Sequence, residues 1–298
     1  MSRNFGDSEK YIKNLFIIGS VFIMNDKSYE VISSAKPSCS KGEPKTDIYI
    51  LAKELKSSAV TEIKISLKKA NADFLENKIG DERALALFGQ DWKYIVSAAI
   101  LKLQDEFKCK QLIYRDKKGR TVAGSITLGW KFELLNKPGG LLSNKITLSK
   151  KQVIDVYAGT NLPDDKKNAL VDGVRIPDSG IANYLLFGDT ELYTNTQDVI
   201  DNIILISSYT DSTPNVYLAC KALNYRTHQH KFDGNRPLCV FVDWNVHNNK
   251  LTPTIRFDAP LVTRGNIVAE KLINSLKTLN ITTTDDITVD NISSTVIL

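Results

Sequence analysis

The sequence predicts an α/β protein in which a mixed central sheet is flanked by helices, followed by a C-terminal α+β extension. Two short apolar runs, 47–52 and 60–67, lie on either side of a polar turn, which indicates two adjacent strands. Between residues 81 and 107, apolar side chains recur at helical spacing and predict a long amphipathic helix that covers one face of the sheet. The run Asn136-Lys137-Pro138-Gly139-Gly140 favours a linker, so we expect the extension to begin there.

The chain before these strands predicts a helix and a strand pair. Ser8 is a suitable N-cap for a helix over 8–18, whose apolar residues share one face. Residues 21–24 and 29–32 are expected to pair with each other around a tight turn. The segment 33–44, which contains prolines and a glycine, is expected to be a loop that leads into the next strand.

The strand expected over 60–67 alternates strictly between polar and apolar residues. Its isoleucines and leucine fall on one face, and Glu62, Lys64 and Ser66 fall on the other. Charged side chains inside a sheet need partners or a metal ion. Asp47 begins the preceding strand and is expected to approach Glu62. Two carboxylates and a lysine in one place predict a site for a divalent cation and a polarised water.

Downstream of this pair, the sequence predicts shorter elements of both kinds. The tail from Asn280 is rich in Thr, Asp and Ser and is expected to be a final edge strand or to fray. The expected elements, in chain order, are a helix around 72–78, strands over 111–115 and 121–135, a short helix over 178–187, a strand or buried helix over 199–208, strands over 216–225 and 238–244, and a helix over 267–279.

Length and composition limit the class of protein. The chain has 298 residues, enough for one large domain or two modest ones. No apolar run reaches the length of a membrane span, and Asp7 and Glu9 stand where a signal peptide would be basic. The four cysteines are scattered and indicate reduced thiols. We therefore expect a cytoplasmic protein with no membrane partner.

The net charge of +5 is unevenly spread along the chain. Residues 1–150 carry 26 lysine and arginine against 17 aspartate and glutamate residues, a balance of +9. Residues 151–298 carry 13 against 17, a balance of −4. A basic surface around a cation site suits a polyanionic substrate such as nucleic acid. A lysine-rich surface with no such role is the alternative.

Asp47, followed after fourteen residues by Glu62-Ile63-Lys64 on the adjacent strand, resembles the PD-(D/E)xK nuclease signature. The longer runs GEPKTDIYI, EIKIS and NADFLENK are most similar to type II restriction endonucleases. Pro44 departs from the pattern because it lies three residues before Asp47 rather than next to it. The resemblance covers roughly residues 8–135 and implies a restriction-endonuclease-like catalytic core over 1–135. Residues 136–298 would then serve DNA recognition or dimerisation, or pack into the same domain.

The resemblance also implies roles for individual residues. Asp47, Glu62 and the backbone carbonyl of Ile63 would hold Mg²⁺, which polarises a scissile phosphate and activates a water. Lys64 would orient that water and stabilise the developing negative charge. Glu9 resembles an upstream acidic residue that some family members add to the site. An exposed acid in the first turn of a helix is the alternative for Glu9.

Polar and basic residues elsewhere are candidates for DNA contacts, with solvated surface positions as the alternative for each. Ser66 and Lys68 follow the predicted site and are candidates for contact with the substrate backbone, although for Lys68 the sequence favours a solvated lysine. The other candidates are Lys118 and Arg120 in a hairpin turn, Arg175 in a second turn, and Arg226, His228 and Arg236 in the basic segment 224–236, whose side-chain types read base edges.

Together these features predict a Mg²⁺-dependent type II restriction endonuclease that cuts double-stranded DNA at a specific sequence. A short palindromic target would require a homodimer, because the symmetry of the protein mirrors that of the site. A structure-specific or repair nuclease with the same site is the first alternative. A DNA-binding protein in which the Asp/Glu/Lys cluster is a structural salt-bridge network is the second.

Overall fold

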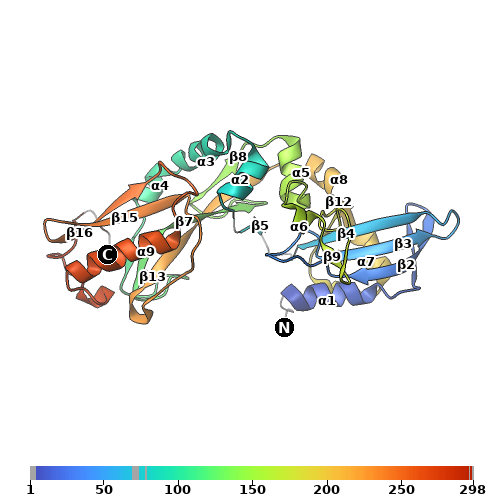
Figure 1. The fold of residues 1–298 in the computed structure, drawn as a ribbon, viewed down its shortest axis with the longest axis horizontal. Coiled ribbons are helices and arrows are strands. Elements are labelled where there is room, and N and C mark those ends of the chain that lie inside the picture. Colours follow the sequence, from blue (N-terminus) through green and yellow to red (C-terminus); the bar gives the residue numbers. More distant parts are fainter. Residues whose placement is uncertain (1–4, 69–73, 78, 295, 297–298) are drawn as a thin grey trace. The chain divides into compact units, whose positions relative to one another are not determined.

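The computed structural model describes residues 5–68, 74–77, 79–294 and 296. The chain folds into two compact units, and each unit is built from two separate segments of sequence. Unit 1 consists of Met1–Asp73 and Leu148–Pro214, and unit 2 consists of Phe74–Thr147 and Asn215–Leu298. Both units mix helices and strands, in agreement with the predicted α/β class (Figure 1). The division expected after residue 135 falls inside unit 2, because the strand that ends there is central to the sheet of that unit.

Unit 1 contains a six-stranded mixed sheet. All neighbouring strands are antiparallel except β4 and β11, which run parallel. The strand pairs predicted before residue 68 are confirmed, and Asn25 and Asp26 close the first hairpin with φ values of 51° and 61°. The strands, in order across the sheet, are β1 (Val21–Met24), β2 (Lys27–Ala35), β3 (Ile48–Glu54), β4 (Val60–Lys68), β11 (Tyr184–Phe187) and β12 (Ile203–Leu205).

One face of this sheet carries the main core of unit 1. Every second side chain of β4 from Ile63 onward is fully buried there, as the alternation predicted. Helices α1 (Phe5–Leu15) and α7 (Thr196–Asn202) add Ile12 and Val199 to this core. Figure 1 shows α1 running alongside the sheet. The helix predicted near 8–18 is therefore confirmed, with a start at residue 5.

The opposite face of the sheet carries the polar side chains of β4 and a smaller apolar cluster around Tyr49. Tyr157 and Tyr209 pack edge to face, with ring centroids 5.4 Å apart, and join α5 to α8. A capping box between Ser149 and Gln152 starts α5. The remaining elements of unit 1 are α5 (Lys150–Ala158), α6 (Asp164–Lys167), the hairpin of β9 (Leu170–Val171) and β10 (Val174–Arg175), η1 (Thr190–Leu192) and α8 (Ile206–Ser212).

Two predictions in unit 1 require correction. The helix expected over 178–187 is wrong, because its last four residues form β11 and pair in parallel with β4. A buried parallel strand is a continuous apolar run, and a short run of this kind has no periodicity that distinguishes it from a helix. The segment 199–208 contains the end of α7, β12 and the start of α8, so both of its expected conformations occur.

Unit 2 contains an antiparallel sheet whose longest strands are β7 and β13. Helix α9 (Gly265–Thr278) packs on β15, where Ser275 Oγ donates a hydrogen bond of 3.2 Å to the carbonyl of Trp244. The strands predicted over 121–135, 216–225 and 238–244 and the last helix are confirmed within a few residues. The strands are β14 (Lys231–Phe232), β13 (Val216–Arg226), β7 (Ser125–Leu135), β15 (Val240–His247) and β16 (Lys250–Arg256), with β5 (Phe74–Glu76) and β6 (Ile113–Tyr114) beside β7 and β8 (Ser143–Ile146) beside β13.

The long helix predicted over 81–107 is three helices, α2 (Asp81–Phe88), α3 (Trp92–Leu101) and α4 (Gln104–Lys108). Gly89, with φ of 77°, ends the first of them. Their aromatic side chains pack on β7, so they cover the sheet of unit 2 and not the sheet that bears Asp47.

Two further segments, 72–78 and the tail from Asn280, also differ from expectation. Of the helix expected around 72–78, residues 74–76 form the strand β5, while 72, 73 and 78 lie outside the described residues. The tail contains the 3₁₀ turn η3 (Thr284–Asp286), and Ile292 forms a bridge with Leu251. Within the described part of the chain, no helix is long and apolar enough to cross a membrane.

Candidate active site

The register of β3 and β4 places Asp47 opposite Ser66. The pairing of Ile48 with Ile65 is the first of this ladder, and the backbone N–H of Asp47 donates to the carbonyl of Ile65 at 2.9 Å. Asp47 Oδ2 accepts hydrogen bonds from the backbone N–H of Leu67 at 2.7 Å and from the hydroxyl of Ser66 at 3.4 Å. The end of β4 therefore fixes the orientation of this carboxylate.

Three charged side chains act on the Asp47 carboxylate: Glu9 from α1, Lys36 just after β2, and Lys68 at the end of β4. Glu9 is only 4% exposed, and its Oε2 accepts a hydrogen bond from Lys36 Nζ. Burial raises the pKa of Asp47 to about 6, and the charge of Glu9 adds to the rise. The two lysines and the N–H of Leu67 act in the opposite direction. Lys36 and Lys68 thus partly compensate the negative charges of Asp47 and Glu9.

The backbone that leads to Asp47 is anchored to a distant loop. The carbonyl of Gly180 accepts hydrogen bonds from the N–H groups of Lys45 at 3.0 Å and Thr46 at 3.2 Å. A Cβ at position 180 would lie 1.7 Å from the carbonyl oxygen of Lys166, so only glycine allows this close approach. The loop from unit 1's second segment thus positions the start of β3.

Glu62 and Lys64 form a separate cluster on the same face of the sheet. Tyr49, which is 1% exposed, donates its hydroxyl to Glu62 Oε1 at 2.6 Å. Lys64 Nζ donates to Glu62 Oε2 at 3.2 Å and to the carbonyl of Asp178 at 3.0 Å. The amide of Asn183 continues this network by bonding the carbonyl of Glu62 and the N–H of Lys64 at 2.9 and 2.7 Å. These contacts tie Glu62 and Lys64 to Tyr49, to Asn183 and to the loop at Asp178.

The expected approach of Asp47 to Glu62 is not found. The hairpin register pairs Glu62 with Leu51, and Glu62 lies four positions before Ser66 on the same strand. At a rise of about 3.3 Å per residue, this is about 13 Å along the strand. Ile63, whose carbonyl was expected to bind Mg²⁺, lies three positions before Ser66, about 10 Å along the strand, and Lys64 lies two positions before Ser66. The register depends on the geometry of the turn, which the spacing in the sequence does not reveal.

The carboxylate whose charge acts on Asp47 is that of Glu9, and not that of Glu62. Glu9 is buried, so the alternative of an exposed first-turn acid does not hold. Mg²⁺ is commonly held by one or two carboxylates, with waters and substrate phosphates as its other ligands, and this pair fits that requirement. Among the described residues, no group of three or more His, Cys, Asp or Glu side chains is arranged to hold a metal ion. Ser66 and Lys68 lie at this site, beside the Asp47 carboxylate.

A hollow of about 300 Å³ opens beside Glu9 and Lys36. Lys36 was not singled out in the sequence, because a lysine that follows a predicted strand has no distinguishing pattern. The residues that line the hollow are Gly6, Glu9, Lys10, Lys13, Ala35, Lys36 and Asp172.

The candidate DNA contacts are divided between the units. Arg175 belongs to unit 1, is exposed, and donates to the carbonyl of Asn168 at 3.0 Å. Arg236 belongs to unit 2 and is also exposed. The other four lie at one end of the unit 2 sheet, where Ser125 pairs with both Tyr114 and Arg226. They are Lys118, Arg120, Arg226 and His228.

This end of unit 2 is formed by two hairpin tips. The N–H of Thr227 donates to the carbonyl of Gly124 at 2.7 Å, and the ring of His228 lies directly over Gly124. Lys118 Nζ donates to Gln111 at 2.7 Å, and Arg226 forms an ion pair of 2.6 Å with Asp233. Lys118 and Arg120 were candidates in one predicted turn, and Arg226 and His228 in another segment. The sheet of unit 2 brings both segments to the same edge.

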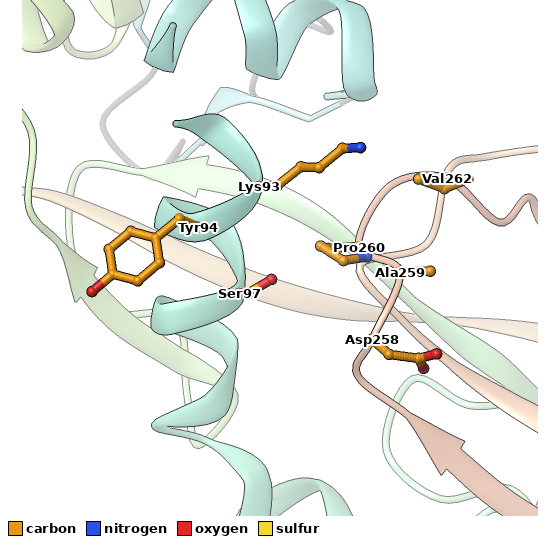
Figure 2. A pocket seen from close by; sticks show the side chains of 7 residues that line it. All are labelled: Lys93, Tyr94, Ser97, Asp258, Ala259, Pro260 and Val262. Carbon is orange, nitrogen blue, oxygen red and sulfur yellow. The ribbon is translucent and has the colours of Figure 1, made fainter. Parts of the chain in front are cut away.

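Unit 2 also has a hollow of about 400 Å³ between α3 and the segment 258–262 (Figure 2). Lys93 and Ser97 of α3 line it on one side, and Asp258 lies on the other. Asp258 is already paired with Arg256, at 2.7 Å. One lysine and one paired carboxylate give this hollow no catalytic arrangement.

Positive charge is concentrated in unit 2. Unit 2 carries 22 lysine and arginine against 15 aspartate and glutamate residues, a balance of +7. Unit 1 carries 17 against 19, a balance of −2. The balance of +9 over residues 1–150 therefore does not describe either unit, because each unit contains residues from both halves of the sequence. The unit that contains Asp47 and Glu62 is not the basic one.

Comparison with known proteins gives no match among protein-family models, curated proteins or solved structures. The residues around Asp47 are therefore the basis for a functional proposal. Among the residues that the structure describes, we take Asp47, with the charges of Glu9 and Lys68 acting on it, as the candidate site.

Proposed function

We propose that this protein is a Mg²⁺-dependent nuclease that hydrolyses phosphodiester bonds of double-stranded DNA at a specific sequence, as type II restriction endonucleases do. The observation that supports it best is the buried Asp47 carboxylate, which Ser66 and Leu67 hold at the end of β4 and on which the charges of Glu9 and Lys68 act. Phosphodiester hydrolysis needs a bound cation and a positive charge near the developing negative charge. This arrangement provides residues for both.

In this proposal, Asp47 and Glu9 hold Mg²⁺, which would polarise the scissile phosphate and lower the pKa of an attacking water. The Ser66 hydroxyl and the Leu67 N–H keep one Asp47 oxygen in place. Lys68 stabilises the negative charge that develops on the phosphate. Because burial raises the pKa of Asp47 to about 6, the carboxylate is charged and ready to bind a cation above that pH.

The order of elements in unit 1 also supports a nuclease core. A helix, an antiparallel set of strands, a second helix and a parallel strand follow one another as α1, β2, β3, β4, α5 and β11. The first segment of unit 2 is inserted between β4 and α5. Relative to the motif identified in the sequence, Ser66-Leu67-Lys68 takes the place of Glu62-Ile63-Lys64 opposite the aspartate. Because residue 66 is a serine and cannot provide a carboxylate, Glu9 would be the second carboxylate ligand of the cation.

Incubation of unmodified phage DNA with the protein and Mg²⁺, followed by gel electrophoresis, tests the proposal. We expect discrete fragments with the wild type and intact DNA with Asp47→Asn, which is close to isosteric but cannot supply a charged ligand. A smear would instead favour a structure-specific or repair nuclease with the same site. Intact DNA with the wild type in both Mg²⁺ and Mn²⁺ would contradict the proposal. Discrete fragments from a palindromic sequence would support the proposed homodimer.

A further inference from the structure

The hollow beside Glu9 is lined by more positive than negative side chains. Lys10 and Lys13 are three residues apart on α1 and therefore lie on the same side of the helix. Within the part of the chain that the structure describes, the ammonium groups of these two lysines pair with no carboxylate. Lys36 joins them, and the acids at the hollow are Glu9 and Asp172.

The hollow and the candidate cation site share two residues, Glu9 and Lys36. Glu9 lines it and is also the carboxylate that acts on Asp47, so the hollow adjoins the candidate cation site directly. Lys36 is shared in the same way, because it bonds Glu9 and also acts on Asp47. When a cation takes over the negative charge of Glu9, the three lysines face only Asp172. The hollow then becomes a site for an anion.

We propose that this hollow binds a phosphate diester that neighbours the scissile one on the same DNA strand. Ammonium groups bind phosphate as point charges through charge-assisted hydrogen bonds. The inference rests on the proposed function and names its substrate more closely. The enzyme should cleave a polynucleotide faster than an isolated phosphodiester, because the isolated phosphodiester leaves the hollow empty.

Binding of a fluorescent DNA duplex in Ca²⁺, measured by anisotropy at several salt concentrations, tests the proposal. We compare Lys10→Gln/Lys13→Gln with Lys53→Gln/Lys56→Gln, a control that removes the same charge from unit 1 at the other end of β3. We expect the first variant to bind at least tenfold more weakly than wild type and to lose about 1 from the slope of log K against log salt, since one phosphate contact is removed. The control should change affinity less than twofold. Equal affinities for the two variants would overturn the proposal.

Two further measurements make the result specific. Lys10→Arg/Lys13→Arg should restore wild-type affinity, which excludes a general loss of folding. Neutral methylphosphonates at the positions flanking the scissile phosphate should weaken wild-type binding and leave the Lys10→Gln/Lys13→Gln variant unaffected. Flanking methylphosphonates that weaken both proteins equally would contradict the assignment of the hollow.

Cleavage distinguishes the failure of this inference from the failure of the proposed function. Hydrolysis of bis(p-nitrophenyl) phosphate, which has no flanking phosphate, should be equal in wild type and in Lys10→Gln/Lys13→Gln, while DNA cleavage falls in the variant. DNA cleavage that is equal in both would remove the hollow from the site and leave the nuclease proposal intact. If the wild type cleaves neither substrate but the variant still binds DNA more weakly than the control, the nuclease proposal fails and the phosphate site remains.

Discussion

At the scale of single residues, the central feature is a carboxylate held in a buried place by its own hairpin. Asp47 is oriented by the Leu67 N–H and the Ser66 hydroxyl, and Glu9 lies close enough to raise its pKa further. Ionisation of a buried carboxylate with a second negative charge acting on it is unfavourable, and a bound divalent cation would offset part of that cost. The stability of the protein should therefore respond to both pH and divalent cations.

The pH response follows from the direction of the Asp47 shift. Its pKa rises from 3.8 to about 6 on folding, so between these values the folded state binds more protons than the unfolded state. The contribution of Asp47 to the free energy of unfolding is then fully present below about pH 4. It decreases as pH rises through about 6, by about 3 kcal/mol for this group alone. In thermal unfolding without metal, wild type should lose stability relative to Asp47→Asn over this range. Saturating Ca²⁺ should reverse the loss above pH 6, and identical pH profiles for the two proteins would contradict the assignment.

Tyr49 allows a separate test of the Glu62–Lys64 cluster. Its buried hydroxyl bonds the Glu62 carboxylate at 2.6 Å, so Tyr49→Phe removes a charge-assisted hydrogen bond. Glu62 is 34% exposed and can recover part of that bond from water. We expect a loss of about 1–2 kcal/mol in the free energy of urea unfolding and no change in cleavage. Normal stability with lost cleavage would return Glu62 to the catalytic site.

At the scale of elements, the sequence predicts strands more successfully than their register. Strict alternation from Glu62 to Leu67 identifies β4 and its buried face, because a period of two has only one structural meaning. The turn that joins β3 and β4 decides whether Asp47 meets Glu62 or Ser66, and its geometry depends on tertiary packing. The four-residue strand β11 and the breaks in the helix expected over 81–107 were missed because local periodicity does not record pairing partners.

The site itself was predicted in part for the same reason. Asp47, Glu9, Ser66 and Lys68 were all identified from sequence, but the roles of Glu62 and Lys64 were derived from a motif whose register is set elsewhere. Lys36 could not be identified, because it reaches Glu9 only when α1 and the end of β2 come together. These contacts are determined by packing between elements that are distant in the sequence.

Gly180 tests whether the loop positions the site. Alanine there would place a Cβ 1.7 Å from the Lys166 carbonyl oxygen and displace the carbonyl that holds Lys45 and Thr46. We expect Gly180→Ala to lower stability by about 1–3 kcal/mol and to weaken Ca²⁺ binding measured by calorimetry. Gly173→Ala is the control: its φ of 83° is strained for alanine, but nothing lies near the added Cβ. Reduced stability with equal Ca²⁺ affinity in both variants would separate the loop from the site.

At the scale of the whole molecule, the chain divides its charge between two units that are each assembled from two segments. The acid pair belongs to unit 1, which has a balance of −2, while unit 2 carries +7. The edge of unit 2 formed by the turn at Lys118 and the tip at His228 gathers several of these cations. If the protein acts on DNA, much of the binding free energy should come from unit 2 and from counterion release.

Salt therefore provides the test at this scale. We expect DNA affinity in Ca²⁺ to fall steeply between low and physiological salt, as measured by anisotropy. Lys118→Gln/Arg120→Gln should reduce the slope of log K against log salt by about 1–2, since each phosphate contact contributes about 0.9. These residues are exposed, so the melting temperature should not change. An affinity independent of salt would contradict a polyanionic substrate.

The most direct test of the proposed site compares two lysines on the same strand. Lys68 acts on Asp47, whereas Lys64 pairs with Glu62, which lies about 13 Å from Ser66 along β4. In single-turnover cleavage of a DNA duplex, Lys68→Ala should lower the rate by a factor on the order of a thousand, the usual effect of removing one preorganised electrostatic group. Lys64→Ala should cleave at close to the wild-type rate and unfold at a lower temperature. Lost cleavage in Lys64→Ala with full activity in Lys68→Ala would contradict the site centred on Asp47 and Glu9.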